Sequence, residues 1–153
     1  MAEQNPLIAH ALGEADGKIE TNSKEAFLTS WQNGFRAVEA DFTYTSDGTL
    51  VVRHDFEKDG SYYRLEIKPS GSLVMDTKTF TSTPAVYEQT PMTAVDLLYL
   101  MQEYPDMYLI TDTKTTDKAQ VQRQFRDLVN IANNIGSPEI LSRIIPQLYN
   151  KEM

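Results

Sequence analysis

Short apolar segments that end in a titratable side chain constrain the fold of this chain more than any other feature. Residues 6–10 end at His10, residues 50–54 end at His54, and residues 107–112 end at Asp112. Each run has the length and composition of a buried strand that carries a polar residue at its carboxyl end. A further alternating segment, residues 35–44, has the period of a strand with two different faces.

Helical patterns separate most of these strands. Asn22 is expected to cap a helix that ends near Gly34, Thr93 to cap a second one, and a long amphipathic helix ends at Gly136. Strands alternate with helices except at the turn 46–48, where one strand leads directly into the next. This order predicts an α/β fold with a mainly parallel sheet.

The chain of 153 residues is 41% hydrophobic, enough for one domain, 1–153, with a real core. Residues 57–91 differ in composition from the rest of the chain, because Gly, Pro and Ser interrupt short β-prone stretches. We expect an inserted β-hairpin or meander there, outside the main sheet.

The charge balance narrows the range of partners. Lys plus Arg is 14 and Asp plus Glu is 22, so the formal net charge is 14 − 22 = −8. Such a surface repels nucleic acid phosphates, and a phosphate-bearing substrate needs a local cation to approach. Cysteine is absent from the sequence, which excludes thiolate metal sites and a cysteine nucleophile. We expect a soluble domain without a signal or transmembrane segment, and the compartment stays open.

Carboxylates gather at two of the predicted strand ends. Glu39 and Asp41 stand at i and i+2 of one strand, so their side chains point the same way, and Asp112 ends another strand. Because close carboxylates repel one another unless a proton or a cation lies between them, we expect one divalent cation, Ca²⁺ or Mg²⁺, at this edge. The alternative is a solvated strand face.

The sequence has only two histidines, and both follow predicted strands. His10 and His54 are candidates for a general acid and a general base, because imidazole titrates near neutral pH. Lys114 is a candidate for neutralising a phosphate oxygen, and Gln147 for lining a substrate pocket. Taken singly, each residue is also compatible with a structural or surface role.

These residues occur in segments that resemble a known family. Ile8-Ala-His10, Val38-Glu-Ala-Asp41, Thr45 to Asp55 with its Ser-Asp-Gly turn and His-Asp end, and Asp112-Thr-Lys114 look like the glycerophosphodiester phosphodiesterases. The order of these pieces is more specific than any one of them. The resemblance covers most of the chain.

The resemblance implies a fold, a site and a reaction. The family fold is a (β/α)8 barrel, in which His10 and His54 would be the acid–base pair. Glu39, Asp41 and Asp112 would hold the divalent cation, and Lys114 would contact the phosphate. A neighbouring hydroxyl of the substrate would attack phosphorus, and water would open the resulting cyclic phosphate. The expected substrate is a small phosphodiester or a phospholipid, the latter with peripheral membrane contact.

Departures from the family pattern keep other functions open. Ala11 stands where the family usually has Arg, and Asp112 where it usually has Glu. The Asp-x-Lys form is closer to sphingomyelinase D-type phospholipases, so a lipid phosphodiesterase of C or D type is one alternative. A catalytically silent metal- or ligand-binding module is another.

Length is the last departure. A complete barrel needs roughly 250 residues, whereas this chain provides about five predicted strands. We therefore expect an N-terminal portion of a barrel, a partial barrel that associates with the remaining half or with itself.

Overall fold

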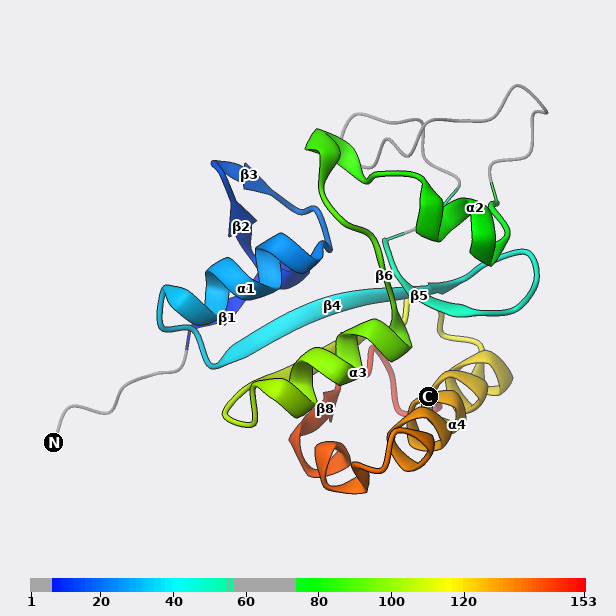
Figure 1. Cartoon of the computed structure of the whole chain (residues 1–153). Helices are drawn as coiled ribbons and strands as arrows, with labels where there is room; N and C mark the ends of the chain where they lie inside the picture. Colours follow the sequence, from blue (N-terminus) through cyan, green and yellow to red (C-terminus); the bar gives the residue numbers. More distant parts are fainter. Residues whose placement is uncertain (1–6, 55, 57–73) are drawn as a thin grey trace, which may run out of the picture.

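The computed structural model describes residues 7–54, 56 and 74–153. Its main sheet has six strands in the order β6-β5-β4-β7-β8, with β1 also paired to β4 (Figure 1). Four strands run parallel to one another: β1 (Ile8–Ala9), β4 (Ala37–Tyr44), β7 (Tyr108–Asp112) and β8 (Ile144–Pro146). The other two are antiparallel to their neighbours: β5 (Leu50–Val52) and β6 (Met92–Thr93). The fold is thus α/β with a mixed sheet.

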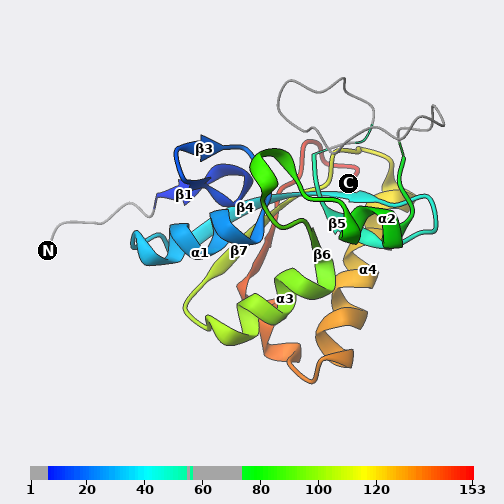
Figure 2. The same cartoon turned by 45° about the horizontal axis from the view of Figure 1, so that its top comes forward.

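Helices connect the strands and cover one face of the sheet. The longer ones are α1 (Lys24–Gln32), α3 (Ala94–Glu103) and α4 (Lys118–Asn134). Short 3-10 turns occupy η1 (His10–Leu12), η2 (Val86–Glu88) and η3 (Pro138–Arg143). A small hairpin of β2 (Glu14–Ala15) and β3 (Lys18–Ile19) follows η1. Figure 2 shows α3 and α4 on the same side of β4.

The hydrophobic core lies between the sheet and these helices. Val38, Ala40 and Phe42 of β4 are buried and belong to the same cluster as Phe27 of α1 and Leu97 of α3. Because side chains alternate along a strand, the intervening residues of β4 must point to the other face of the sheet. Packing of the helices therefore decides which face of β4 is left for polar side chains.

Three of the four predicted helix boundaries are confirmed, at Gly34, Thr93 and Gly136, and one is wrong. Thr93 caps α3, and a reciprocal capping box joins it to Asp96. Gly34, with φ of +89°, follows the C-cap of α1, in the left-handed conformation that glycine adopts without strain. The prediction that Asn22 caps this helix was wrong, because Ser23 is the N-cap and accepts a hydrogen bond from the Ala26 N–H.

The predicted β insert at 57–91 needs correction in its described part. Residues 57–73 lie outside the described residues, whereas residues 74–91 contain α2 (Thr77–Ser82) and η2 and no strand. Asp76 caps α2 by accepting a hydrogen bond from the Thr79 N–H, and Phe80 is buried against Phe56. A cap and one buried aromatic ring thus outweigh the β propensity of the threonines.

Hydrogen bonds join the carboxyl end of α3 to η3. The Arg143 guanidinium donates hydrogen bonds to the carbonyls of Met101 (2.9 Å) and Met107 (2.8 Å). It thereby satisfies a carbonyl that the helix end leaves without an intrahelical partner. This contact joins the start of β7 to the segment that leads into β8. Among the described residues, no helix has both the length and the apolar character needed to cross a membrane.

Candidate active site

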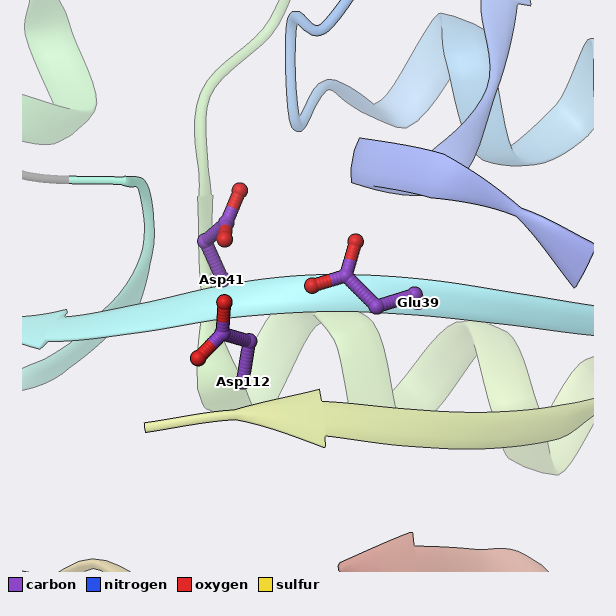
Figure 3. A group of neighbouring side chains, drawn as sticks. All are labelled: Glu39, Asp41 and Asp112. Atoms are coloured by element: carbon purple, nitrogen blue, oxygen red, sulfur yellow. The ribbon is translucent and has the colours of Figure 1, made fainter. Parts of the chain in front are cut away.

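Three buried carboxylates lie together on the face of the sheet that the helices leave free. Glu39 and Asp41 come from β4 and Asp112 from the end of β7, where the register places Asp112 beside Asp41. Figure 3 shows the three side chains close together, Glu39 and Asp41 on β4 and Asp112 on the adjacent strand. One oxygen from each lies within 4.8 Å of the others, and their exposed fractions are 7%, 0% and 6%. The expected convergence of these three residues is therefore observed.

Glu39 is held by the turn that follows β1. The Ala11 N–H donates to Glu39 Oε2 at 2.8 Å, and Nε2 of His10 lies 3.8 Å from the same oxygen. Ala11 is fully buried, and its φ of +47° aims its N–H at the carboxylate. Burial, and then the charge of Asp41, raise the pKa of Glu39 above its usual range. An unpaired charge at Glu39 is therefore costly, and a cation nearby would relieve that cost.

Asn22 positions Asp41, a contact that the sequence analysis missed. Its Nδ2 donates to Asp41 Oδ2 at 2.7 Å, and its Oδ1 accepts a hydrogen bond from the Asp41 N–H at 3.2 Å. Asn22 is 2% exposed and has φ of +50°, a conformation that Asn tolerates better than most residues. In the sequence, the same Asn could equally be a helix cap, so only the contact itself identifies its role.

Lys114 lies over the carboxylates. Its Nζ is 2.6 Å from Asp41 Oδ1 and pairs still more closely with Asp112 Oδ2. Burial pushes the pKa of Lys114 down, but the two carboxylates outweigh this and raise it above its ordinary value. Burial likewise acts to raise the pKa of Asp112, and hydrogen bonds from Lys114 and Tyr149 outweigh it, so that the net pKa is lowered. Asp112 is thus ionised and Lys114 protonated at neutral pH.

Tyr149 is a second residue that the sequence analysis missed. Its hydroxyl donates to Asp112 Oδ1 at 2.7 Å, and the Gln147 side-chain amide donates to the same hydroxyl at 3.2 Å. Burial and the Asp112 charge raise the pKa of Tyr149 to about 12. Gln147 therefore reaches the site through Tyr149. The segment after β8 offers no periodic or composition signal that would have indicated this contact.

The two histidines lie in segments that approach the carboxylates by different routes. His10 follows β1 and is 64% exposed, with Nδ1 at 4.0 Å from Glu20 Oε1. His54 follows β5, which is antiparallel to β4, so the rule that parallel carboxyl ends meet does not apply to it. Instead, β4 continues past β7 and turns back, and the Arg53 N–H donates to the Asp41 carbonyl at 2.9 Å. His54, half-buried, is the next residue along the chain.

The residues present suit a hard divalent cation. Three carboxylates offer oxygen ligands within a few ångströms of one another, and a protonated Lys114 already lies between two of them. A pocket of about 320 Å³ lies beside His10 and is lined partly by Ile8, Ile19 and Phe35. The arrangement can therefore place a cation beside the imidazole of His10, and the same imidazole borders the recess.

Comparison with known proteins supports the family resemblance. The sequence model of the Glycerophosphoryl diester phosphodiesterase family matches residues 14–62, which include Glu39, Asp41 and His54. The resemblance seen in the sequence is thereby confirmed over this segment. None of the curated proteins matches the chain.

Solved structures show a shared fold. A glycerophosphodiester phosphodiesterase from Parabacteroides distasonis ATCC 8503 has a TM-score of 0.70 at 18% identity, covering 95% of this chain and 56% of its own. A phosphodiesterase from Oleispira antarctica, in complex with the product sn-glycerol-3-phosphate, has a TM-score of 0.66 at 17% identity, over 95% of this chain and 57% of its own. The chain thus spans somewhat more than half the length of these structures.

Proposed function

We propose that this chain is the part of a glycerophosphodiester phosphodiesterase that carries its metal, acid–base and phosphate-binding residues. The observation that carries the proposal is the buried cluster of Glu39, Asp41 and Asp112, with His10 at 3.8 Å from Glu39. This cluster occurs within a fold shared with glycerophosphodiester phosphodiesterases and overlaps the segment that matches their family. We propose further that the sheet is part of a (β/α)8 barrel.

The carboxylates would hold one divalent cation, Ca²⁺ or Mg²⁺. The cation would acidify the attacking hydroxyl and stabilise negative charge on the phosphoryl oxygens. The Ala11 N–H and Asn22 hold Glu39 and Asp41 in place for this role, and Tyr149 holds Asp112. One oxygen of each carboxylate lies within 4.8 Å of one oxygen of each of the other two.

The histidines would supply the proton transfers. One imidazole takes the proton from the glycerol hydroxyl as that oxygen bonds to phosphorus. The other gives a proton to the leaving alcohol as its bond to phosphorus breaks, and water then opens the cyclic phosphate. We assign the acid role in the first step to His10, whose Nε2 lies 3.8 Å from Glu39 Oε2 and which borders the pocket that would hold the leaving alcohol. His54 would then be the base.

The substrate we propose is a glycerophosphodiester. The Oleispira antarctica neighbour is in complex with sn-glycerol-3-phosphate, the product that hydrolysis of such a diester leaves. Lys114, close to the carboxylates, would contact the phosphate, and the pocket beside His10 would accept the released alcohol. Gln147 would line the opposite side through its contact with Tyr149.

Phosphorus NMR tests this function. The protein is incubated with glycerophosphoethanolamine and Mg²⁺ or Ca²⁺, with and without EDTA, beside the His54→Ala variant. We expect glycerol phosphate only when the metal and His54 are both present. A cyclic phosphate that persists would indicate a phospholipase-like outcome instead. Metal binding without any turnover would indicate a silent binding module.

A further inference from the structure

Lys114 contacts two carboxylates for which a bound divalent cation would compete. Its ammonium lies between Asp41 Oδ1 and Asp112 Oδ2, two oxygens of the candidate metal cluster. The residue has φ of +51°, and its own N–H donates to Asp112 Oδ1 at 3.2 Å. This turn brings the side chain back over the strand end. Its side chain is 24% exposed, so a path to solvent is open to it.

The other oxygen of Asp112, Oδ1, already accepts hydrogen bonds. Tyr149 donates to Oδ1, and this contact leaves Oδ2 as the oxygen on which Lys114 lies. Likewise, Asn22 donates to Asp41 Oδ2 and leaves Oδ1 for Lys114. The two oxygens that the neighbouring residues leave free are therefore the two that Lys114 neutralises. A divalent cation would need the same oxygens.

Two cations cannot share this space. An ammonium and a divalent ion within about 4 Å repel each other strongly in a partly buried site. Binding of the metal therefore requires the ammonium to leave its two carboxylates, and the flexible stem of lysine permits this. Once released, the ammonium remains tethered beside the metal, where a phosphate would lie.

We propose that Lys114 is a tethered counter-ion that the divalent cation displaces, and that this displacement makes its ammonium available to the phosphate of the substrate. The inference rests on the proposed function, because it assumes that the three carboxylates hold a metal. It adds an order of events, in which the metal binds first and creates the phosphate site. By linkage, the phosphate must also strengthen metal binding.

Calorimetric titration of the EDTA-treated protein with Mg²⁺ and Ca²⁺ tests the displacement. We expect Lys114→Met to bind the metal about tenfold more tightly than the wild type, because the competing charge is gone. Lys118→Met is the matched control, since it removes one positive charge from an exposed position on α4 and should stay within about twofold. Lys114→Arg keeps the charge and should not gain affinity. Circular dichroism verifies that each variant is folded.

The outcomes separate the two proposals. Equal or weaker metal binding by Lys114→Met overturns the displacement while leaving the metal site intact. Equal gains for Lys114→Met and Lys118→Met overturn it too, because net charge then explains the change. If neither the wild type nor any variant binds a metal, the proposed function itself falls.

A titration with sn-glycerol-3-phosphate tests the second half of the inference. Without metal, wild type and Lys114→Met should bind it equally weakly, because Lys114 is engaged by the carboxylates. With saturating Mg²⁺, the wild type should bind about tenfold more tightly than Lys114→Met, as a charge-assisted contact then forms. The same wild-type advantage with and without metal would show that Lys114 is never sequestered.

Discussion

The two faces of the central sheet contrast in what covers them. On the helix-packed face, defined here by Val38, Ala40, Phe42 and Leu109, every side chain is buried against helices. On the carboxylate face, Glu39, Asp41 and Asp112 are buried, while Tyr108 and Ile145 are 45% and 48% exposed. Both faces are built from the same strands, β4, β7 and β8, whose residues alternate between them.

The contrast separates stability from chemistry. The helix-packed face removes apolar surface from water, which is the main source of folding free energy. The carboxylate face places three acids close together, an arrangement that raises the pKa of Glu39 and costs stability until a cation neutralises it. We therefore expect substitutions on the two faces to change different measured quantities, and the following predictions test this in order of decreasing effect.

The largest expected effect is on folding. Phe42→Ala, on the helix-packed face, should lower the free energy of unfolding by about 3–5 kcal/mol, because it leaves a cavity in the hydrophobic core. Tyr108→Ala, an aromatic truncation on the other face, should cost much less, since that ring is already half exposed. Urea denaturation followed by circular dichroism measures both. Similar losses for the two variants would contradict the contrast.

Substitutions should change the metal affinity only where they lie on the carboxylate face. Asp41→Asn should weaken Mg²⁺ or Ca²⁺ binding by at least about 100-fold, with the fold retained because Asn still accepts the hydrogen bond from Asn22. Asp117→Asn is the control: it makes the same change at the cap of α4, where Asn serves as well. Calorimetry compares the two, and a comparable loss in Asp117→Asn would point to net charge rather than to ligation.

The pH dependence of stability should report on Glu39. Its pKa is raised by folding, so the folded protein holds this proton more tightly than the unfolded chain, whose value is 4.5. Stability of the metal-free protein should therefore fall as pH rises above about 4.5 and level off above the folded pKa. Glu39→Gln removes this dependence and should be more stable at pH 7 by about 1 kcal/mol. Denaturation curves in EDTA between pH 4 and 8 check this, and parallel curves for both proteins would refute it.

The smallest effect concerns the exposed apolar side chains of the carboxylate face. Ile145→Thr should change stability by no more than about 0.5 kcal/mol and should reduce self-association in sedimentation velocity runs. Ile140→Thr makes the same change at a fully buried position of η3 and should cost several times more. If Ile145→Thr proves as damaging as Ile140→Thr, this face is covered in the folded protein.

Much of the site was predictable because the relevant signals are local. The spacing of Glu39 and Asp41 places both on one side of a strand whatever lies around it. Thr93 and Gly34 mark helix ends by chemistry that acts within four residues. Asp112 required only the further assumption that two parallel strands are adjacent, and the pairing of β4 with β7 confirms it.

Other features depended on contacts between distant residues. Asn22 suits a helix cap as well as a hydrogen bond to Asp41, and only its hydrogen bonds to Asp41 of β4 in the folded chain decide between them. Tyr149 meets Asp112 across 37 positions of sequence, because β8 pairs with β7 and returns the chain to the same edge. The antiparallel pairing of β5 with β4 likewise returns the chain near His54 to Asp41.

The sequence by itself determined the alternation of strands and helices, the two-faced pattern of β4 and the types of side chain that the site contains. The tertiary structure decided which residues hold those side chains in place and where the charge of Lys114 lies. The physical reason is the distance along the chain over which each interaction acts. Backbone periodicity and helix capping act over a few residues. Hydrogen bonds and ion pairs between buried groups exist only after packing has excluded water and brought distant segments together.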